Sequence, residues 1–232
     1  MTLYETIFTR RSVRQYEKEP LDAVALSEIE KYLEDAPQLA GQTAQFEIAS
    51  ADKLKGVAAP HAILAYSDDS DAALTNIGYV LQGVDLYLQS KGLGSLWMGQ
   101  GKPVERKPDY RILLAFGKTS VPPRSSENDF KRKAVLETSN EDNAVARAAR
   151  LAPSAANFQP WKLHFAPGKV SVQYNGKGIG KLFASKMQKI DLGIILKTVE
   201  LALEHEGKTV QSITPKTSEQ RFAIEPDLTA MH

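Results

Sequence analysis

An internal repeat is the feature that most limits how this chain can fold. Residues 75–92 (TNIGYVLQGVDLYLQSKG) and 190–207 (IDLGIILKTVELALEHEG) align at a spacing of 115 residues, with six identical positions. An Ala-Pro pair also recurs, at residues 36–37 and 152–153, and its spacing of 116 residues is half of the chain. Because a repeat changes how every later motif is interpreted, we interpret the chain as two related halves. Two unrelated amphipathic helices that both end at glycine are the simpler alternative.

Both repeated segments predict helices that are apolar on more than one face. Such helices lie in the centre of a fold rather than on its surface. Each contains an interior glycine, Gly78 or Gly193, and an interior glycine costs a helix about 1 kcal/mol relative to alanine. Close approach of the two helix backbones would offset that cost. The sequence therefore predicts that the two helices cross in the centre of a pseudo-dimer.

The rest of the pattern mixes strands and helices. β-Branched and aromatic residues between turn formers predict strands at residues 46–49, 61–66, 112–116, 162–165 and 170–174. Apolar periodicity predicts helices at residues 2–9, 22–35 and 143–151, besides the two central ones. This order indicates an α+β fold in which helices cover sheets. The Pro- and Ser-rich segment 118–128 is the predicted linker, so we place the halves at residues 1–118 and 119–232.

Composition excludes several classes of function. The 232 residues include no cysteine, which excludes disulfides, thiolate nucleophiles, iron–sulfur clusters and cysteine-ligated zinc. A net charge of +1 gives no field that would attract nucleic acid or an anionic membrane. No apolar run reaches the length of a membrane span or of a signal peptide's core. We expect a soluble, cytoplasmic protein.

Basic residues cluster directly after the first predicted helix, in RRSVR at residues 10–14. Three guanidinium groups and a hydroxyl can converge on a phosphate through charge-assisted hydrogen bonds. If the segment is extended, Arg10, Ser12 and Arg14 share one face. A solvated basic turn at the C-terminal end of a helix would explain the same residues without a ligand.

Two further segments combine small residues with polar groups or glycines. In APSAANFQPW, residues 152–161, small side chains would let a planar ligand approach the backbone, while Ser154 and Asn157 offer hydrogen bonds. In GLGSLWMG, residues 92–99, the glycines permit positive φ and close backbone approach. Neither segment needs a ligand by itself. A loop that satisfies its own polar groups and a glycine cap before a buried strand are the alternatives.

Together the three segments resemble the nitroreductase family of FMN-dependent oxidoreductases. The resemblance covers nearly the whole chain and implies a nitroreductase-like fold, a pseudo-dimer of two α/β halves with the central long helices packed between sheets. Members of the family carry both motifs in one short subunit and bind each flavin between the subunits of a homodimer. Here the first half has the arginine motif but QLAGQTAQF in place of the loop, and the second half has the loop but only DFKRKAVLE ahead of it. The resemblance thus implies one retained FMN site shared by the halves, one degenerate site, and a monomer or homodimer.

Carried over to this chain, the family's cofactor contacts fall on both halves. The residues implied to hold the FMN phosphate and ribityl chain are Arg10, Arg11, Ser12 and Arg14. The residues implied to line the isoalloxazine and ribityl from the second half are Pro153, Ser154, Ala155 and Asn157. The backbone implied to face the flavin N5 edge is that of Leu96, Trp97, Met98 and Gly99. The resemblance also suggests Lys55 at the pyrimidine edge and Arg132 near the phosphate.

The same resemblance implies a mechanism. NAD(P)H would reduce the flavin, leave, and be replaced in the same space by a nitroaromatic, a quinone or a similar acceptor, which gives ping-pong kinetics. The flavin performs the hydride transfer, so no protein acid or base is assigned a catalytic role. Two alternatives stay open: a flavin-binding protein without turnover, for storage or sensing, and a relative that uses reduced flavin for dehalogenation or flavin cleavage.

The remaining motifs do not suggest another chemistry. The four histidines, His61, His164, His205 and His232, share no metal-type spacing, and no carboxylate pair stands out. The segment GKGIGK at residues 176–181 fits neither the dinucleotide-binding nor the Walker glycine spacing. Asn175-Gly176 after a predicted strand is better explained as a hairpin turn.

Overall fold

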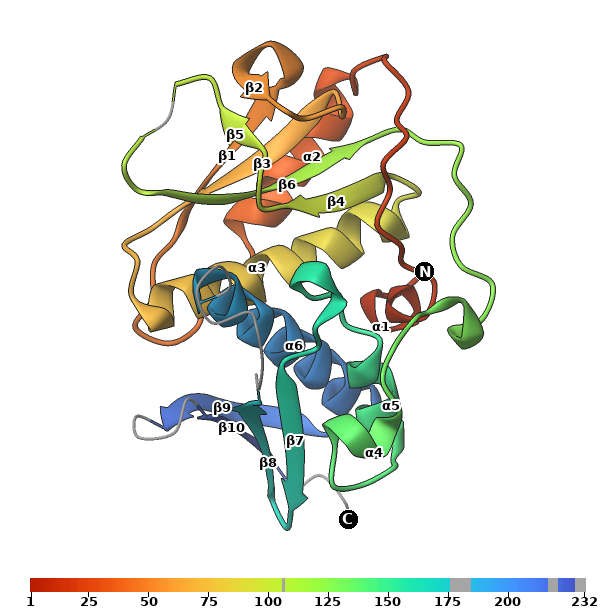
Figure 1. Ribbon diagram of the computed structural model, residues 1–232, viewed down its shortest axis with the longest axis vertical. Helices are drawn as coiled ribbons and strands as arrows, with labels where there is room; N and C mark the ends of the chain where they lie inside the picture. The colour runs from red at the N-terminus through yellow and green to blue at the C-terminus, as the bar shows by residue number, and fades with distance from the viewer. Residues whose placement is uncertain (106, 176–184, 217–220, 228–232) are drawn as a thin grey trace.

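Two four-stranded sheets lie on either side of two long helices in the computed structural model, which describes residues 1–105, 107–175, 185–216 and 221–227 (Figure 1). The central helices are α3 (Asp71–Ser90) and α6 (Ser185–His205). The strands of the first sheet, in spatial order, are β1 (Gln45–Ser50), β3 (His61–Tyr66), β6 (Tyr110–Gly117) and β4 (Gly94–Met98). Those of the second sheet are β7 (Trp161–Ala166), β8 (Lys169–Tyr174), β10 (Arg221–Asp227) and β9 (Thr209–Lys216). The expected α+β architecture, with the central helices between sheets, is confirmed.

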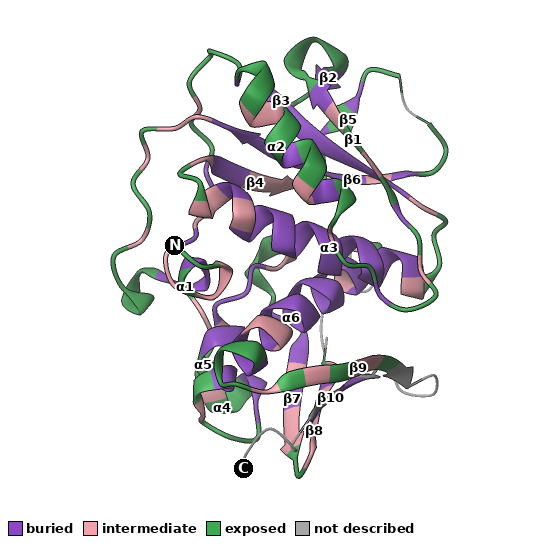
Figure 2. Cartoon of the chain, turned by 180° about the vertical axis from the view of Figure 1, so that it is seen from behind, coloured by how far each residue is buried: buried purple, intermediate pink, exposed green. Residues whose placement is uncertain are grey.

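Shorter elements complete the fold. The helices are α1 (Leu3–Ile7), α2 (Ala23–Glu34), α4 (Val135–Thr138) and α5 (Ala144–Arg150). A small separate sheet pairs β2 (Leu54–Lys55) with β5 (Lys102–Pro103), and the 3-10 turns are η1 (Ala51–Lys53), η2 (Glu127–Asp129) and η3 (Ala155–Asn157). Thr2 and Glu5 form a capping box that starts α1. Helix α2 buries Ile29 and Leu33 and exposes its outer side (Figure 2).

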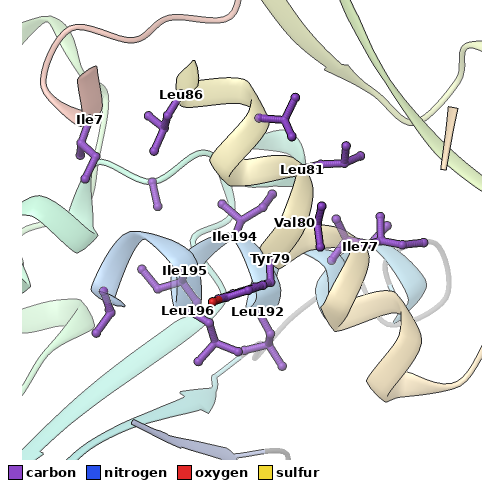
Figure 3. Close-up of a cluster of buried hydrophobic side chains, with 14 of the residues drawn as sticks. Ile7, Ile77, Tyr79, Val80, Leu81, Leu86, Leu192, Ile194, Ile195 and Leu196 are labelled. Carbon is purple, nitrogen blue, oxygen red and sulfur yellow. The ribbon is translucent and has the colours of Figure 1, made fainter. Parts of the chain in front are cut away.

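The centre of the core is the contact between α3 and α6. Every residue of α3 from Ala73 to Leu86 is buried, and Figure 3 shows apolar side chains of both helices filling this region. A Cβ atom at Gly78 would lie 2.0 Å from the carbonyl oxygen of Ile190, and one at Gly193 would lie 1.9 Å from that of Thr75. The predicted crossing at the glycines is confirmed, because a side chain at either position would overlap the other helix.

Every strand and helix predicted from the sequence is present, but the sequence analysis missed several elements. Strand β4 lies in the glycine-containing segment, where a buried strand after a glycine cap was predicted only as the alternative to a ligand loop. Strands β9 and β10 each contain a proline, which normally weakens a strand prediction. Pro226 of β10 lies at a register shift against β9, where the ladder is irregular.

The predicted linker runs without regular structure from β6 to η2. It lies along the N-terminal segment, because Glu17 N donates to Lys118 O at 2.9 Å and Arg124 N donates to Thr9 O at 2.8 Å. The GKGIGK segment lies outside the described residues, and so does Gly176 of the turn expected at Asn175-Gly176. His232 also lies outside them. Within the described ranges, no helix is long and apolar enough to span a membrane, and no three His, Asp or Glu side chains form a metal-type cluster.

Candidate functional site

A cavity of about 450 Å³ lies beside the N-terminal arginine segment, β4, the loop ahead of β7 and α6, and brings together most of the predicted site residues. From the first half, it is lined by Arg10, Ser12, Arg14, Leu96, Trp97 and Gly99. From the region after residue 118, it is lined by Arg132, Pro153, Ser154, Ala155 and Asn157. Segments that are more than 100 residues apart in the sequence therefore share one concave site.

Arg10 is held in the cavity wall by a buried ion pair with α3. Its Nε lies 3.0 Å from Oδ2 of Asp85, and the two side chains are 2% and 0% exposed. Oδ1 of Asp85 accepts hydrogen bonds from Ser95 Oγ at 2.5 Å and from Gln89 Nε2 at 3.1 Å. Nη2 of Arg10 is buried and has no hydrogen-bond partner among the described residues. An unsatisfied buried donor is costly, so an acceptor atom that reached this nitrogen would stabilise Arg10.

The arginine segment is extended, as its predicted alternation requires. Ser12 forms a parallel bridge with Ser95 of β4, and Val13 N donates to Ser95 O at 2.9 Å. Arg10, Ser12 and Arg14 consequently line the cavity together. Arg11 does not line it, because its Nη1 instead donates to the carbonyl of Pro122 in the linker at 2.7 Å.

Two more arginines complete the positive part of the cavity. Arg132 donates to Asn157 Oδ1 at 2.5 Å and to Leu151 O at 3.1 Å. Arg124, from the linker, donates to the carbonyl of Arg10 and lies over the ring of Phe130, 4.2 Å from its centroid. Burial, followed by the charges of Arg10 and Arg124, lowers the pKa of Arg132 to about 10. Guanidinium groups that disfavour each other's charge in this way would be stabilised by a bound anion.

The loop ahead of β7 adopts a strained conformation against the cavity. Ala156, Asn157 and Gln159 have φ values of 46°, 59° and 48°, in the left-handed region that side chains disfavour. Asn157 Nδ2 donates to Lys131 O at 2.6 Å, and Ser154 Oγ accepts from Gln159 N at 2.9 Å. The loop thus satisfies much of its own hydrogen bonding, as the simpler alternative proposed. Strain of this kind is nevertheless concentrated at ligand sites.

Two other predicted residues lie outside the cavity lining. Met98 packs with the apolar cluster between the outer face of the first sheet and its covering loops. Lys55 is exposed on β2, where it pairs with Lys102 of β5. Leu96 and Trp97 of β4 and the following Gly99 line the cavity. Gly99 approaches Met187 of α6, whose Sδ would be 3.5 Å from a Cβ at that position.

Asp191 of α6 also lines the cavity, and the sequence analysis missed it. Its side chain accepts a hydrogen bond from Ala155 N at 2.9 Å. Burial raises the pKa of this carboxyl to about 7, although the bond from Ala155 acts in the opposite direction. The sequence signal that could have found it is the internal repeat, which aligns Asp191 with the polar Asn76 at the spacing of 115 residues.

We expect Asp191 to make the ligand-free protein less stable as the pH rises. Its pKa is raised from 3.8 to about 7 on folding, so the folded state binds the proton more tightly between these values. In Asp191→Asn this dependence is lost. Between about pH 4 and about pH 8, the free energy of unfolding of the native protein should fall relative to the variant by up to about 4 kcal/mol. Urea unfolding of both proteins across this range measures the difference, and a constant difference would contradict the assignment.

Comparison with known proteins identifies relatives of this fold. The family model described as "Putative TM nitroreductase" matches residues 2–203. The crystal structure of a "putative nitroreductase" from Thermotoga maritima MSB8 has a TM-score of 0.74 and 21% identity, over 97% of this chain and 94% of that chain. At this identity the likeness establishes the fold, which is nitroreductase-like. No curated protein matches the chain.

Two further solved structures match a smaller part of the chain. A nitroreductase family protein from Clostridium difficile 630 has a TM-score of 0.48 and 18% identity, over 59% of this chain and 95% of that chain. A protein described as a "putative nitroreductase in complex with FMN", from Desulfovibrio desulfuricans, has a TM-score of 0.47 and 19% identity, over 62% of this chain and 98% of that chain. The family model, by contrast, spans most of the sequence. This chain therefore belongs to the nitroreductase family that the model describes.

Proposed function

We propose that this protein is an FMN-dependent oxidoreductase that passes hydride from NAD(P)H, through the flavin, to a small acceptor such as a nitroaromatic or a quinone. The observation that carries the proposal is the arginine cluster of the cavity, formed by Arg10, Arg14, Arg124 and Arg132. Arg10 offers a buried donor without a protein partner, and planar guanidinium groups suit phosphate recognition. The cavity volume is in the range of cofactor sites.

The residues present fit FMN. The arginine cluster and Ser12 would hold the phosphate end. The Pro153–Asn157 loop and the backbone of β4 would hold the ring between the halves, with apolar Ile190 and Ile194 of α6 in the same cavity. When bound, the flavin supplies hydride transfer, while the protein orients it and shapes the space beside it. NAD(P)H and the acceptor would use that space in turn, which predicts ping-pong kinetics.

We also propose that the chain arose by fusion of two copies of one nitroreductase unit, with the boundary near residue 118. One hydrogen bond that is present in both halves supports this. Leu39 N donates to Asn76 Oδ1 at 2.8 Å, and at the corresponding positions Ala155 N donates to Asp191 Oδ1 at 2.9 Å. Because both halves supply the cavity, one chain can form a complete site without a partner subunit.

Only one of the two sites would bind flavin. At the spacing of 115 residues, Glu200 corresponds to Asp85, the partner of Arg10. Glu200 is instead bonded to Tyr79 Oη at 2.8 Å and to Lys197 Nζ at 2.6 Å. The second copy of this acidic position is thus engaged by other side chains, and we expect one FMN per chain.

The proposal is tested by the visible spectrum and by turnover. We expect the purified protein to be yellow, or to become so with added FMN, at one flavin per chain. It should oxidise NAD(P)H when menadione or a nitrofuran is supplied. A colourless protein that does not take up FMN would refute the proposal. A yellow protein without acceptor-dependent NAD(P)H oxidation would select the storage or sensing alternative.

A further inference from the structure

Asp191 has no role in the phosphate and ring contacts described above, although it lies in the same cavity. Its side chain is only 3% exposed, and Oδ1 accepts the hydrogen bond from Ala155 N. Among the described residues, no other donor bonds to the carboxylate. Lys189, two residues earlier on α6, is instead paired with Asp71 at 2.6 Å. The second carboxylate oxygen therefore remains for a donor that the cavity would admit.

In the first half, Asn76 occupies the position that corresponds to Asp191, and there the side chain only holds a loop in place. Asn76 accepts the hydrogen bond from Leu39 N through Oδ1. Its other polar atom, Nδ2, donates to Gln38 Oε1 at 2.8 Å, so the protein satisfies both ends of the amide. A neutral amide is sufficient for that task. A buried carboxylate is more costly unless its oxygens are hydrogen-bonded, so the carboxylate in the second half requires another reason.

We infer that Asp191 is a cofactor-binding and positioning residue. One carboxylate oxygen holds the Ala155 N–H, and the other accepts a hydrogen bond from a hydroxyl or N–H of the bound flavin. The inference rests on the function proposed above. FMN carries such donors in its ribityl hydroxyls and its ring N–H, whereas its phosphate offers only acceptors for the arginine cluster. Asp191 thus supplies an acceptor within a cavity whose other charged side chains are donors.

The test is an FMN titration of Asp191→Asn and of the native protein at pH 8, above the pKa of about 7 for Asp191, monitored by the quenching of flavin fluorescence. Asparagine keeps an acceptor for Ala155 N, as Asn76 does for Leu39 N, but replaces the second oxygen with a donor. We expect the Kd for FMN to rise by about tenfold or more, the usual effect of losing a hydrogen bond to a charged group. The melting temperature of the ligand-free variant at pH 8 should be no lower than that of the native protein. Unchanged FMN affinity would show that Asp191 only holds the loop, and would overturn the inference.

Asn76→Asp is the matched control, because it makes the reverse exchange at the corresponding position outside the cavity. It should leave the Kd for FMN unchanged. If both variants lost FMN affinity equally, the loss would come from a disturbed helix core rather than from a lost contact with FMN, and this would also overturn the inference. If the native protein does not bind FMN, the proposed function fails as well. If the native protein binds FMN and Asp191→Asn binds it equally, only the role of Asp191 fails.

Discussion

Replacing Gly193 by alanine is expected to leave little folded protein. The added Cβ would lie 1.9 Å from Thr75 O and 2.4 Å from Tyr79 N, both backbone atoms of α3. Backbone atoms cannot rotate away as a side chain can, so the two central helices would have to separate across the buried core. Overpacking that shifts backbone costs about 1–3 kcal/mol and occasionally more, and we expect this variant to exceed about 3 kcal/mol, a large part of a typical domain's stability.

Gly83→Ala is the control for this prediction, because it lies in the interior of α3. Its nearest neighbours would be ordinary contacts, at 3.6 Å from Lys197 Cε and 3.8 Å from Tyr32 Oη. Alanine favours a helix over glycine by about 1 kcal/mol, so this variant should be as stable as the native protein or more stable. Denaturant unfolding of both variants separates the two effects. Equal stability would show that the helices do not cross closely at Gly193.

The sequence predicted the centre of this fold because the determining signals are local and periodic. Apolar residues on several faces marked both central helices, and Gly78 and Gly193 indicated where their backbones meet. Strands β9 and β10 are neighbours in the sequence and pair with each other, but only the pairing of β10 with the much earlier β8 joins them to the sheet, and strand propensity depends on such context. Their prolines and polar residues give little local strand signal.

The cavity could be predicted only where a motif marked it. Alternation in an extended segment predicts that Arg10, Ser12 and Arg14 share one face, and all three line the cavity. The same alternation turns Arg11 to the other side, where it bonds the linker. Arg124 was not predicted because it lies in a segment that reads as a linker, and only the tertiary fold brings it against the carbonyl of Arg10. Lys55 was assigned by resemblance alone, and no periodicity related it to the other residues.

Arg10→Ala and Asn157→Ala should each weaken FMN binding, because the proposed site needs both halves. Arg10 would contribute the buried donor at the phosphate, and charge-assisted hydrogen bonds are worth about 1.5–3 kcal/mol each. We therefore expect the Kd for FMN to rise by about 100-fold in Arg10→Ala. Asn157 acts on the same site through Arg132, which it bonds at 2.5 Å, so its loss should cost about tenfold. Loss of affinity in only one variant would place the cofactor in a single half.

Arg10→Ala also leaves Asp85 as an unpaired buried charge, and this must be separated from the loss of a ligand contact. Breaking a buried pair typically destabilises a protein by about 3–5 kcal/mol, whereas removing both charges is often neutral. The double variant Arg10→Ala, Asp85→Asn keeps an acceptor for Ser95 and Gln89 and should recover stability, yet still bind FMN weakly. Arg147→Ala, at a 60% exposed arginine outside the cavity, should bind FMN as the native protein does. If the double variant recovers both stability and FMN affinity, Arg10 supports the fold rather than the phosphate.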